Sequence, residues 1–265
     1  MSYRVILFDL FDTLVTFERD RLPEVRVNGR VLRSTAGKLH EVFRPFAPGV
    51  ELEAFVDALF WSWQEAERLR GESQREVAAA ERLGLMVTRL GLDLSMLAPE
   101  ALPVLLATHM RELSKAVVFP PSHLALLDAL RSRYRLGVVS NFDYTPTARG
   151  ILEREGIAGH FESIVVSDQV GWRKPKAVIF ETALRRMAIN PDEALFVGDR
   201  ADIDVAGAQG VGMPAVWINP ARTALPEGIQ PPDFEIRDLR ELGDILGLDP
   251  GPAMGSPRPD EASKA

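Results

Sequence analysis

The sequence predicts an α/β protein: a Rossmann-like core with a five-stranded, mainly parallel sheet, joined to a second, mostly helical unit. Two observations predict this fold. Short apolar runs alternate with helical patterns over the second half of the chain, and a long segment with few strand signals separates the first run from the others. Strands that alternate with helices imply right-handed crossovers and therefore parallel pairing.

Five apolar runs have the length and composition of buried strands. They are residues 4–8, 136–140, 163–166, 195–197 and 215–218. Helical periodicity lies between them, at residues 122–133, 147–155, 176–187 and 201–209. We assign residues 1–15 and 119–248 to one core domain that contains these elements.

Residues 16–118 have a different pattern. Apolar residues recur at helical spacing over residues 52–90, and a further helix is expected at residues 104–114. We predict a helical domain of its own over residues 16–118, placed above the carboxyl edge of the sheet. Its aromatic residues Phe60, Trp61 and Trp63 are interpreted as core rather than as a substrate pocket.

Residues 249–265 are rich in Pro, Gly, Ser and Ala and are predicted to be a disordered tail.

The overall composition argues against several classes of protein. The chain of 265 residues has 31 Lys and Arg, 38 Asp and Glu, a net charge of -7 and no cysteine. We therefore expect no nucleic-acid partner, no disulfide and no Cys-based metal site. Without a signal peptide or a membrane-length apolar run, a cytoplasmic location is expected.

Polar residues follow four of the predicted strands, and the carboxyl ends of parallel strands meet at one edge of a sheet. Carboxylates from two strand ends can hold Mg²⁺, which prefers oxygen ligands. A lysine and a hydroxyl can bind phosphate oxygens, and one carboxylate can attack phosphorus. The residues concerned are Asp9, Ser140 with Asn141, Lys174, and Asp199 with Asp204.

These four segments resemble, in order, the motifs of the haloacid dehalogenase (HAD) superfamily. The resemblance covers about residues 4–220, and the helical insert stands where the C1 cap class has its cap. The stretches around Asp143 and Trp172 are most similar to the HDHD3-like subgroup. The motifs are Phe8-Asp9-Leu10-Phe11-Asp12-Thr13-Leu14, Val139-Ser140-Asn141, Lys174-Pro175, and Gly198-Asp199 followed by Asp204.

The resemblance implies a role for each motif residue. Asp9 would be the nucleophile and a Mg²⁺ ligand, and Phe11 would ligate the metal through its backbone carbonyl. Asp199 would be a further ligand, with Asp204 as a ligand or a supporting anchor. The groups that bind or neutralise the phosphoryl group would be Ser140, the Asn141 amide and Lys174.

Phe11 departs from the pattern of HAD phosphatases. The residue two positions after the nucleophile is usually a second Asp, which serves as general acid and base. Phe11 can do neither, and such help is worth about 10²–10⁴-fold in rate. HAD dehalogenases have an aromatic residue here, but they lack the distal acidic motif that this chain keeps at Asp199 and Asp204.

Several neighbouring residues can be interpreted in two ways. Asp12 either replaces the missing acid or, as we favour, caps the turn after the first strand. Arg200 is expected to pair with Asp202 at the surface. Asp168 either orients Lys174 or is a solvated loop acid. Arg70 and Arg75 are the residues of the insert to test for contacts with an anionic substrate.

The sequence thus favours a Mg²⁺-dependent HAD phosphatase that acts on a small phosphorylated metabolite through an aspartyl-phosphate at Asp9. It also leaves open a 2-haloacid dehalogenase-like hydrolase and a catalytically weak HAD-like binding or regulatory protein. A monomer or a homodimer is expected.

Overall fold

Six parallel strands form the central sheet. The computed structural model describes residues 3–248, and the sheet has the order β10-β9-β8-β1-β6-β7. The strands are β1 (Val5–Phe8), β6 (Arg135–Ser140), β7 (Phe161–Val166), β8 (Ala194–Gly198), β9 (Ala215–Ile218) and β10 (Phe234–Ile236). β1 lies between β6 and β8, so its carboxyl end opens at the middle of the sheet edge.

All five predicted strands are present, but the predicted count of five is wrong because β10 adds an edge strand. β10 has three residues, of which only Ile236 is buried. It therefore lacks the continuous apolar run that marks a strand covered on both faces.

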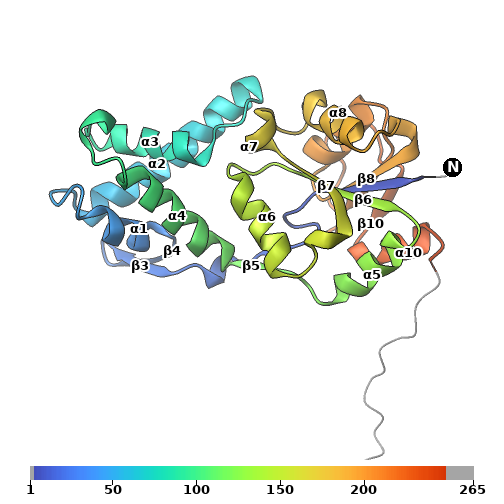
Figure 1. The fold of residues 1–265 in the computed structure, drawn as a ribbon, viewed down its shortest axis with the longest axis horizontal. Helices are drawn as coiled ribbons and strands as arrows, with labels where there is room; N and C mark the ends of the chain where they lie inside the picture. Colours follow the sequence, from blue (N-terminus) through green and yellow to red (C-terminus); the bar gives the residue numbers. More distant parts are fainter. Residues whose placement is uncertain (1–2, 249–265) are drawn as a thin grey trace, which may run out of the picture.

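Helices cover both faces of the sheet, as Figure 1 shows. Along β1, Ile6 and Phe8 pack in one apolar cluster and Val5 and Leu7 in the other, because successive side chains point to opposite faces. The first cluster includes residues of α5 (Ser122–Arg131), α6 (Thr145–Arg154) and α10 (Leu242–Ile245). The second includes residues of α8 (Ala177–Arg186) and α9 (Ala206–Gly210).

Five short helical turns of the described residues link these elements: η3 (Ala158–His160), α7 (Ser167–Val170), η4 (Pro191–Glu193), η5 (Ala201–Val205) and η6 (Leu239–Glu241). Among them, η5 has π-helical hydrogen bonding.

The insert between β1 and α5 lies beside the sheet and has an apolar core of its own (Figure 1). Its helices are α1 (Ala36–Phe43), α2 (Leu52–Ser73), α3 (Ala79–Arg89), η2 (Leu94–Met96) and α4 (Ala101–Ser114), after the short η1 (Arg19–Arg21). The chain enters and leaves it through two paired antiparallel strands, β2 (Thr16–Phe17) and β5 (Val117–Val118). The limits of the core domain (1–15 with 119–248) and of the helical domain (16–118) stay proposals. The predicted tail at 249–265 lies outside the described residues.

The insert is not purely helical, because it contains a β-hairpin of β3 (Glu24–Val27) and β4 (Arg30–Arg33). Asn28 and Gly29 join the strands with φ values of 50° and 73°. Asn-Gly between alternating residues is a strong signal for this two-residue turn. The expectation of few strands missed that signal.

The periodicity over residues 52–90 is divided between two helices. α2 ends at Ser73, and Gln74 has a left-handed φ of 58°. The chain then runs toward the sheet domain, where Arg75 forms an isolated bridge with Trp172. This interruption, residues 74–78, carries side chains that are important at the site described below.

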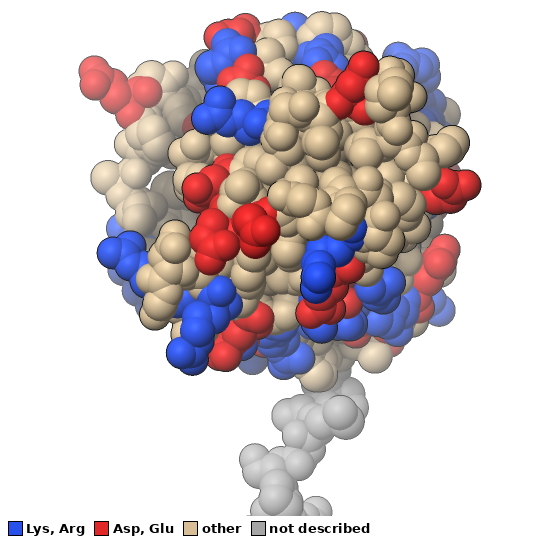
Figure 2. Space-filling view, turned by 90° about the vertical axis from the view of Figure 1, so that its left-hand side faces the viewer, with Lys and Arg blue, Asp and Glu red and all other residues tan. Residues whose placement is uncertain are grey.

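The outer face of the insert carries charges of both signs around a broad uncharged area (Figure 2). Positive charge does not dominate this face, in keeping with the net charge of -7. Within residues 3–248, no helix combines the length and apolar character needed to cross a bilayer.

Candidate active site

Three charged side chains from distant parts of the sequence meet at the carboxyl end of β1. Asp9 follows β1 directly, and its backbone N–H donates to Val197 O over 2.9 Å. Lys174 Nζ lies 2.5 Å from Asp9 Oδ1 and 2.8 Å from Asp204 Oδ1. All three side chains are buried, so the ammonium and the two carboxylates compensate one another's charge away from water.

Asn141 holds the backbone of Lys174 in place. Its Nδ2 donates to Lys174 O over 3.0 Å, and its Oδ1 accepts from Lys174 N–H over 2.7 Å. The resemblance implied that the Asn141 amide binds phosphate, but both polar atoms of its side chain are engaged with the Lys174 backbone. The loop after β6 fixes the lysine that neutralises Asp9.

Asp199 completes a group of three carboxylates with Asp9 and Asp204. One oxygen of each lies within 4.8 Å of the others, and Asp204 Oδ2 also accepts from the Arg200 backbone N–H over 3.0 Å. Gly198 makes this arrangement possible, since a Cβ there would overlap the Asp204 side chain. Carboxylate oxygens so arranged could hold a hard divalent cation.

Burial and mutual repulsion shift the pKa values of these groups. Burial raises the pKa of Asp9, with Lys174 opposing and Asp204 adding to the rise. Burial and the charge of Asp204 raise the pKa of Asp199 to about 6. Burial would lower the pKa of Lys174, but Asp204 and Asp9 outweigh it and raise that pKa, so the lysine stays charged.

Ser140 lies at the end of β6 with a fully buried side chain. Its Oγ has no hydrogen-bond partner among residues 3–248. A buried hydroxyl without a partner is rare in folded proteins. A ligand oxygen at this sheet edge would satisfy it.

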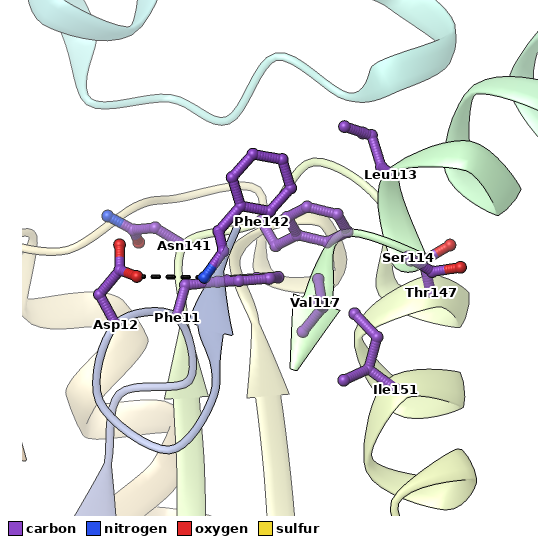
Figure 3. Close-up of a pocket in the computed structure, with 10 residues that line it drawn as sticks. Phe11, Asp12, Leu113, Ser114, Val117, Asn141, Phe142, Thr147 and Ile151 are labelled. Carbon is purple, nitrogen blue, oxygen red and sulfur yellow. Dashed lines mark hydrogen bonds between the residues drawn. The ribbon is translucent and has the colours of Figure 1, made fainter. Parts of the chain in front are cut away.

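Phe11 lines a cavity of about 320 Å³ together with Phe142 (Figure 3). Its ring lies 4.9 Å from that of Phe142, centroid to centroid. Asn141 and Asp12 line the same cavity. The position where HAD phosphatases usually have an acid is therefore occupied by part of an apolar wall.

Asp12 has the turn contact that we favoured. Its φ is 58°, and its Oδ1 accepts from the Phe17 backbone N–H over 3.3 Å (dashed in Figure 3). An aspartate is one of the few residues that adopt this left-handed conformation readily. The carboxylate thus closes the loop that leads from Asp9 into the insert.

Contacts also define the roles of Arg200 and Asp168. Arg200 pairs with Asp202 over 2.9 Å at the surface, as predicted. Asp168 orients Thr145 instead of Lys174, because its Oδ2 accepts from the Thr145 backbone N–H over 2.8 Å at the start of α6. It is therefore neither a partner of Lys174 nor a free loop acid.

The predictions for the side chains of the insert are partly wrong. Arg70 is buried and bound to acidic residues, and Arg75 pairs with Glu81 over 2.7 Å. Neither lines the cavity. Phe60 and Trp63 are 59% and 50% exposed and stack on each other, so they are not core residues.

Sequence reasoning missed a buried ionic network between the insert and the sheet domain. Glu76, in the interruption between α2 and α3, accepts from Arg70 Nε over 3.0 Å and from Arg173 Nη1 over 2.6 Å. Ser167 Oγ donates to the same carboxylate and accepts from the Phe142 backbone N–H. An acid between two amphipathic helices has no pattern that would have identified it.

The network has a second acid, Asp143, in the loop after Asn141. Its Oδ2 lies 3.2 Å from Arg82 Nε and 3.5 Å from Arg70 Nη2. Two arginines of the insert therefore bind a loop that also carries a site residue.

These features define an α/β protein with a buried carboxylate at the carboxyl end of the central strand, beside a lysine and two further carboxylates. The family comparison agrees. A model described as haloacid dehalogenase-like hydrolase matches residues 3–212, and the chain belongs to this family. The HDHD3-like subgroup stays a prediction.

Individual relatives carry different activities. The chain is 30% identical over 254 residues to the phosphoserine phosphatase of Thermus thermophilus, covering 90% of this chain and 97% of that protein. It is 35% identical over 128 residues to the pyrimidine 5'-nucleotidase YjjG of Escherichia coli, covering 48% of this chain and only 56% of that protein. The solved 2-haloacid dehalogenase of Pseudomonas syringae pv. Tomato DC3000 is 24% identical with a TM-score of 0.66, covering 92% and 98% of the two chains, which shows the shared fold.

Proposed function

We propose that this hydrolase is a Mg²⁺-dependent phosphatase that acts on a small phosphorylated metabolite through an aspartyl-phosphate at Asp9. The observation that carries the proposal is the buried contact of Lys174 with both Asp9 and Asp204 at the end of β1. A lysine there keeps Asp9 available as a carboxylate. It also adds positive charge where a phosphoryl group would arrive.

The residues present fit a magnesium ion. Three carboxylates meet with a single lysine between them, and a divalent cation would offset the remaining repulsion. Asp9, Asp199, Asp204 and the Phe11 carbonyl would hold it. When bound, such an ion supplies charge that stabilises a transferring phosphoryl group.

The chain's own residues account for both halves of the reaction. A carboxylate oxygen of Asp9 attacks phosphorus, the bond from phosphorus to the ester oxygen breaks, and that oxygen leaves with the electron pair. Water then attacks the phosphorus of the aspartyl-phosphate, and the bond from phosphorus to the Asp9 oxygen breaks with its electron pair returning to the carboxylate. The proton lost by the attacking water passes to the released inorganic phosphate or to solvent, and Asp9 is restored. Ser140 Oγ and the Asn141 backbone N–H would bind phosphoryl oxygens, since the Asn141 side chain holds Lys174.

With Phe11 in place of an acid, the rate of the proposed reaction should depend strongly on the leaving group of the ester. No acid stands at that position, so the departing oxygen takes its proton from water. Esters with acidic leaving groups need no such help and should react fastest.

The test is hydrolysis of p-nitrophenyl phosphate with Mg²⁺ and with EDTA, using Asp9→Asn as the blank. Activity that requires both Mg²⁺ and Asp9, with phosphate trapped on wild-type protein after a rapid acid quench, supports the proposal. Hydrolysis that persists in EDTA, or in Asp9→Asn, contradicts it.

Phe11 favours a second candidate, the hydrolysis of a 2-haloacid. Asp199 and Asp204 weigh against it, because with Asp9 they form a carboxylate group suited to a divalent cation. Halide release from 2-chloropropionate without added metal would establish it. A third candidate, a catalytically weak binding or regulatory protein, would keep its biological role in an Asp9→Asn variant.

The remaining expectations stay proposals. They are a small-molecule phosphorylated substrate, a cytoplasmic location, the absence of nucleic-acid and membrane partners, and a monomer or homodimer.

A further inference from the structure

A cavity adjoins the proposed phosphoryl site and is not explained by phosphoryl chemistry. It has a volume of about 320 Å³ and is lined by Phe11 and Asp12, which follow Asp9 in the chain. Asn141, which holds Lys174, is also in its wall. The cavity therefore begins where a group attached to the phosphoryl oxygen would extend.

The wall of this cavity is largely apolar (Figure 3). Phe11 and Phe142 present rings that lie 4.9 Å apart. Side chains of the two joining strands, of α4 and of α6 complete it: Phe17, Val117, Leu113 and Ile151. Among the ten described residues that line it, Asp12 alone carries a charge.

We propose that this cavity binds the leaving group of the substrate, and that this group is uncharged and aromatic; the inference rests on the phosphatase function proposed above. Aromatic rings pack favourably against phenylalanines in offset or edge-on arrangements. A carboxylate or second phosphate would lose its hydration beside Asp12, with no cation in the wall to compensate.

The same assignment explains why Phe11 can replace an acid. The ester oxygen that leaves phosphorus takes the electron pair of the broken bond. When that oxygen is bonded to an aromatic ring, the ring stabilises the resulting anion, which water then protonates. Phe11 contributes binding of the ring in place of proton transfer.

The test compares benzyl phosphate with phosphoglycolate. Both release a primary alkoxide, so their intrinsic reactivities are similar and the comparison isolates recognition of the leaving group. In wild-type protein with Mg²⁺ we expect kcat/KM for benzyl phosphate to be higher by at least about tenfold. Equal values, or a preference for phosphoglycolate, overturn the proposal.

Two variants locate the preference in the cavity. Phe142→Ala should reduce the ratio of the two kcat/KM values about tenfold, whereas Phe60→Ala, the same change at an exposed position of α2, should leave it unchanged. Leu113→Lys should shift the preference toward phosphoglycolate, a gain that misfolding cannot produce. An unchanged ratio in folded Phe142→Ala and in Leu113→Lys overturns the assignment.

A binding measurement separates this inference from the phosphatase proposal. Asp9→Asn is titrated with both esters by calorimetry. If wild-type protein hydrolyses no phosphate ester, the phosphatase proposal fails. The cavity assignment then stands if benzyl phosphate binds more tightly than phosphoglycolate, and fails if it does not.

Discussion

Glu76 and Arg173 form an ion pair that joins the insert to the edge of the sheet where Asp9 and Lys174 lie. Glu76 Oε2 lies 2.6 Å from Arg173 Nη1, and the Glu76 side chain is 1% exposed. Arg173 is the residue before Lys174. The insert thus contacts the chain immediately next to the lysine that binds Asp9.

We expect Glu76→Gln to destabilise the protein by about 3 kcal/mol, because it leaves the buried Arg70 and the half-buried Arg173 with one carboxylate fewer. The matched control is Glu72→Gln, which removes an exposed pair with Arg68 and should cost less than about 1 kcal/mol. Urea denaturation of the three proteins measures both effects. Equal stability of the two variants would contradict the role given to Glu76.

Gly198→Ala should disturb the carboxylate cluster. The added Cβ would overlap the buried Asp204 side chain, and overpacking of this kind costs about 1–3 kcal/mol. We expect weaker Mg²⁺ binding by calorimetry and lower phosphatase activity. Gly150→Ala in α6 is the control, since a Cβ added there would have nothing within 4 Å, and it should stabilise the helix by up to about 1 kcal/mol.

Asp12→Asn should leave kcat for an alkyl phosphate within about threefold of wild type. Asparagine adopts the same left-handed conformation, and its Oδ1 can still accept from Phe17 N–H. An alkyl phosphate is the informative substrate because its poor leaving group depends most on protonation. A loss of about 10²–10⁴-fold would instead identify Asp12 as the general acid.

His109 should make stability depend on pH. Arg82 Nη2 lies 2.9 Å from His109 Nε2, and a guanidinium only donates. Nε2 therefore accepts, and Nδ1 donates to Thr35 Oγ1 over 2.9 Å. Burial and the charge of Arg82 lower the pKa of this imidazole from 6.5 to about 3.

The direction in which stability changes with pH follows from proton binding at His109. Below pH 6.5 the unfolded chain binds a proton at His109 that the folded protein does not, so stability falls as the pH falls. The contribution is fully present above pH 6.5, and about 2 kcal/mol should be lost by pH 5. Urea denaturation at pH 7, 6 and 5 should show a steeper loss for wild type than for His109→Gln. Parallel pH profiles would show that His109 titrates alike in both states.

The meeting of polar residues at the carboxyl edge of the sheet could be predicted from sequence because these residues follow strands. Asp9 and Asp199 follow apolar runs and Ser140 closes one, and parallel pairing brings such positions together. Lys174 and Asp204 were also singled out because they lie downstream of predicted strands, but no periodicity marks their approach to Asp9, and their individual roles came only from the resemblance.

Features that depend on contacts between distant segments could not be predicted. Glu76 meets Arg173 only after the insert has folded against the sheet. The cavity joins Phe11, Leu113 and Phe142 in the same way. Arg70 and Asp168 were misjudged for this reason, because a charged side chain looks available in a sequence until its partners are known.

The hairpin of β3 and β4 is a different case. Its Asn28-Gly29 turn was visible in the sequence, and the surrounding helical periodicity obscured it. The edge strand β10 had no comparable signal, because a short, half-exposed strand needs few apolar residues.

The pairing of β2 with β5 has an evolutionary consequence. Thr16 lies opposite Val118 and Phe17 opposite Val117, so the two cut points for removing the insert are already neighbours. A different insert could be grafted there by recombination without remaking the sheet. Turnover chemistry and choice of substrate can therefore diversify separately in descendants of this chain.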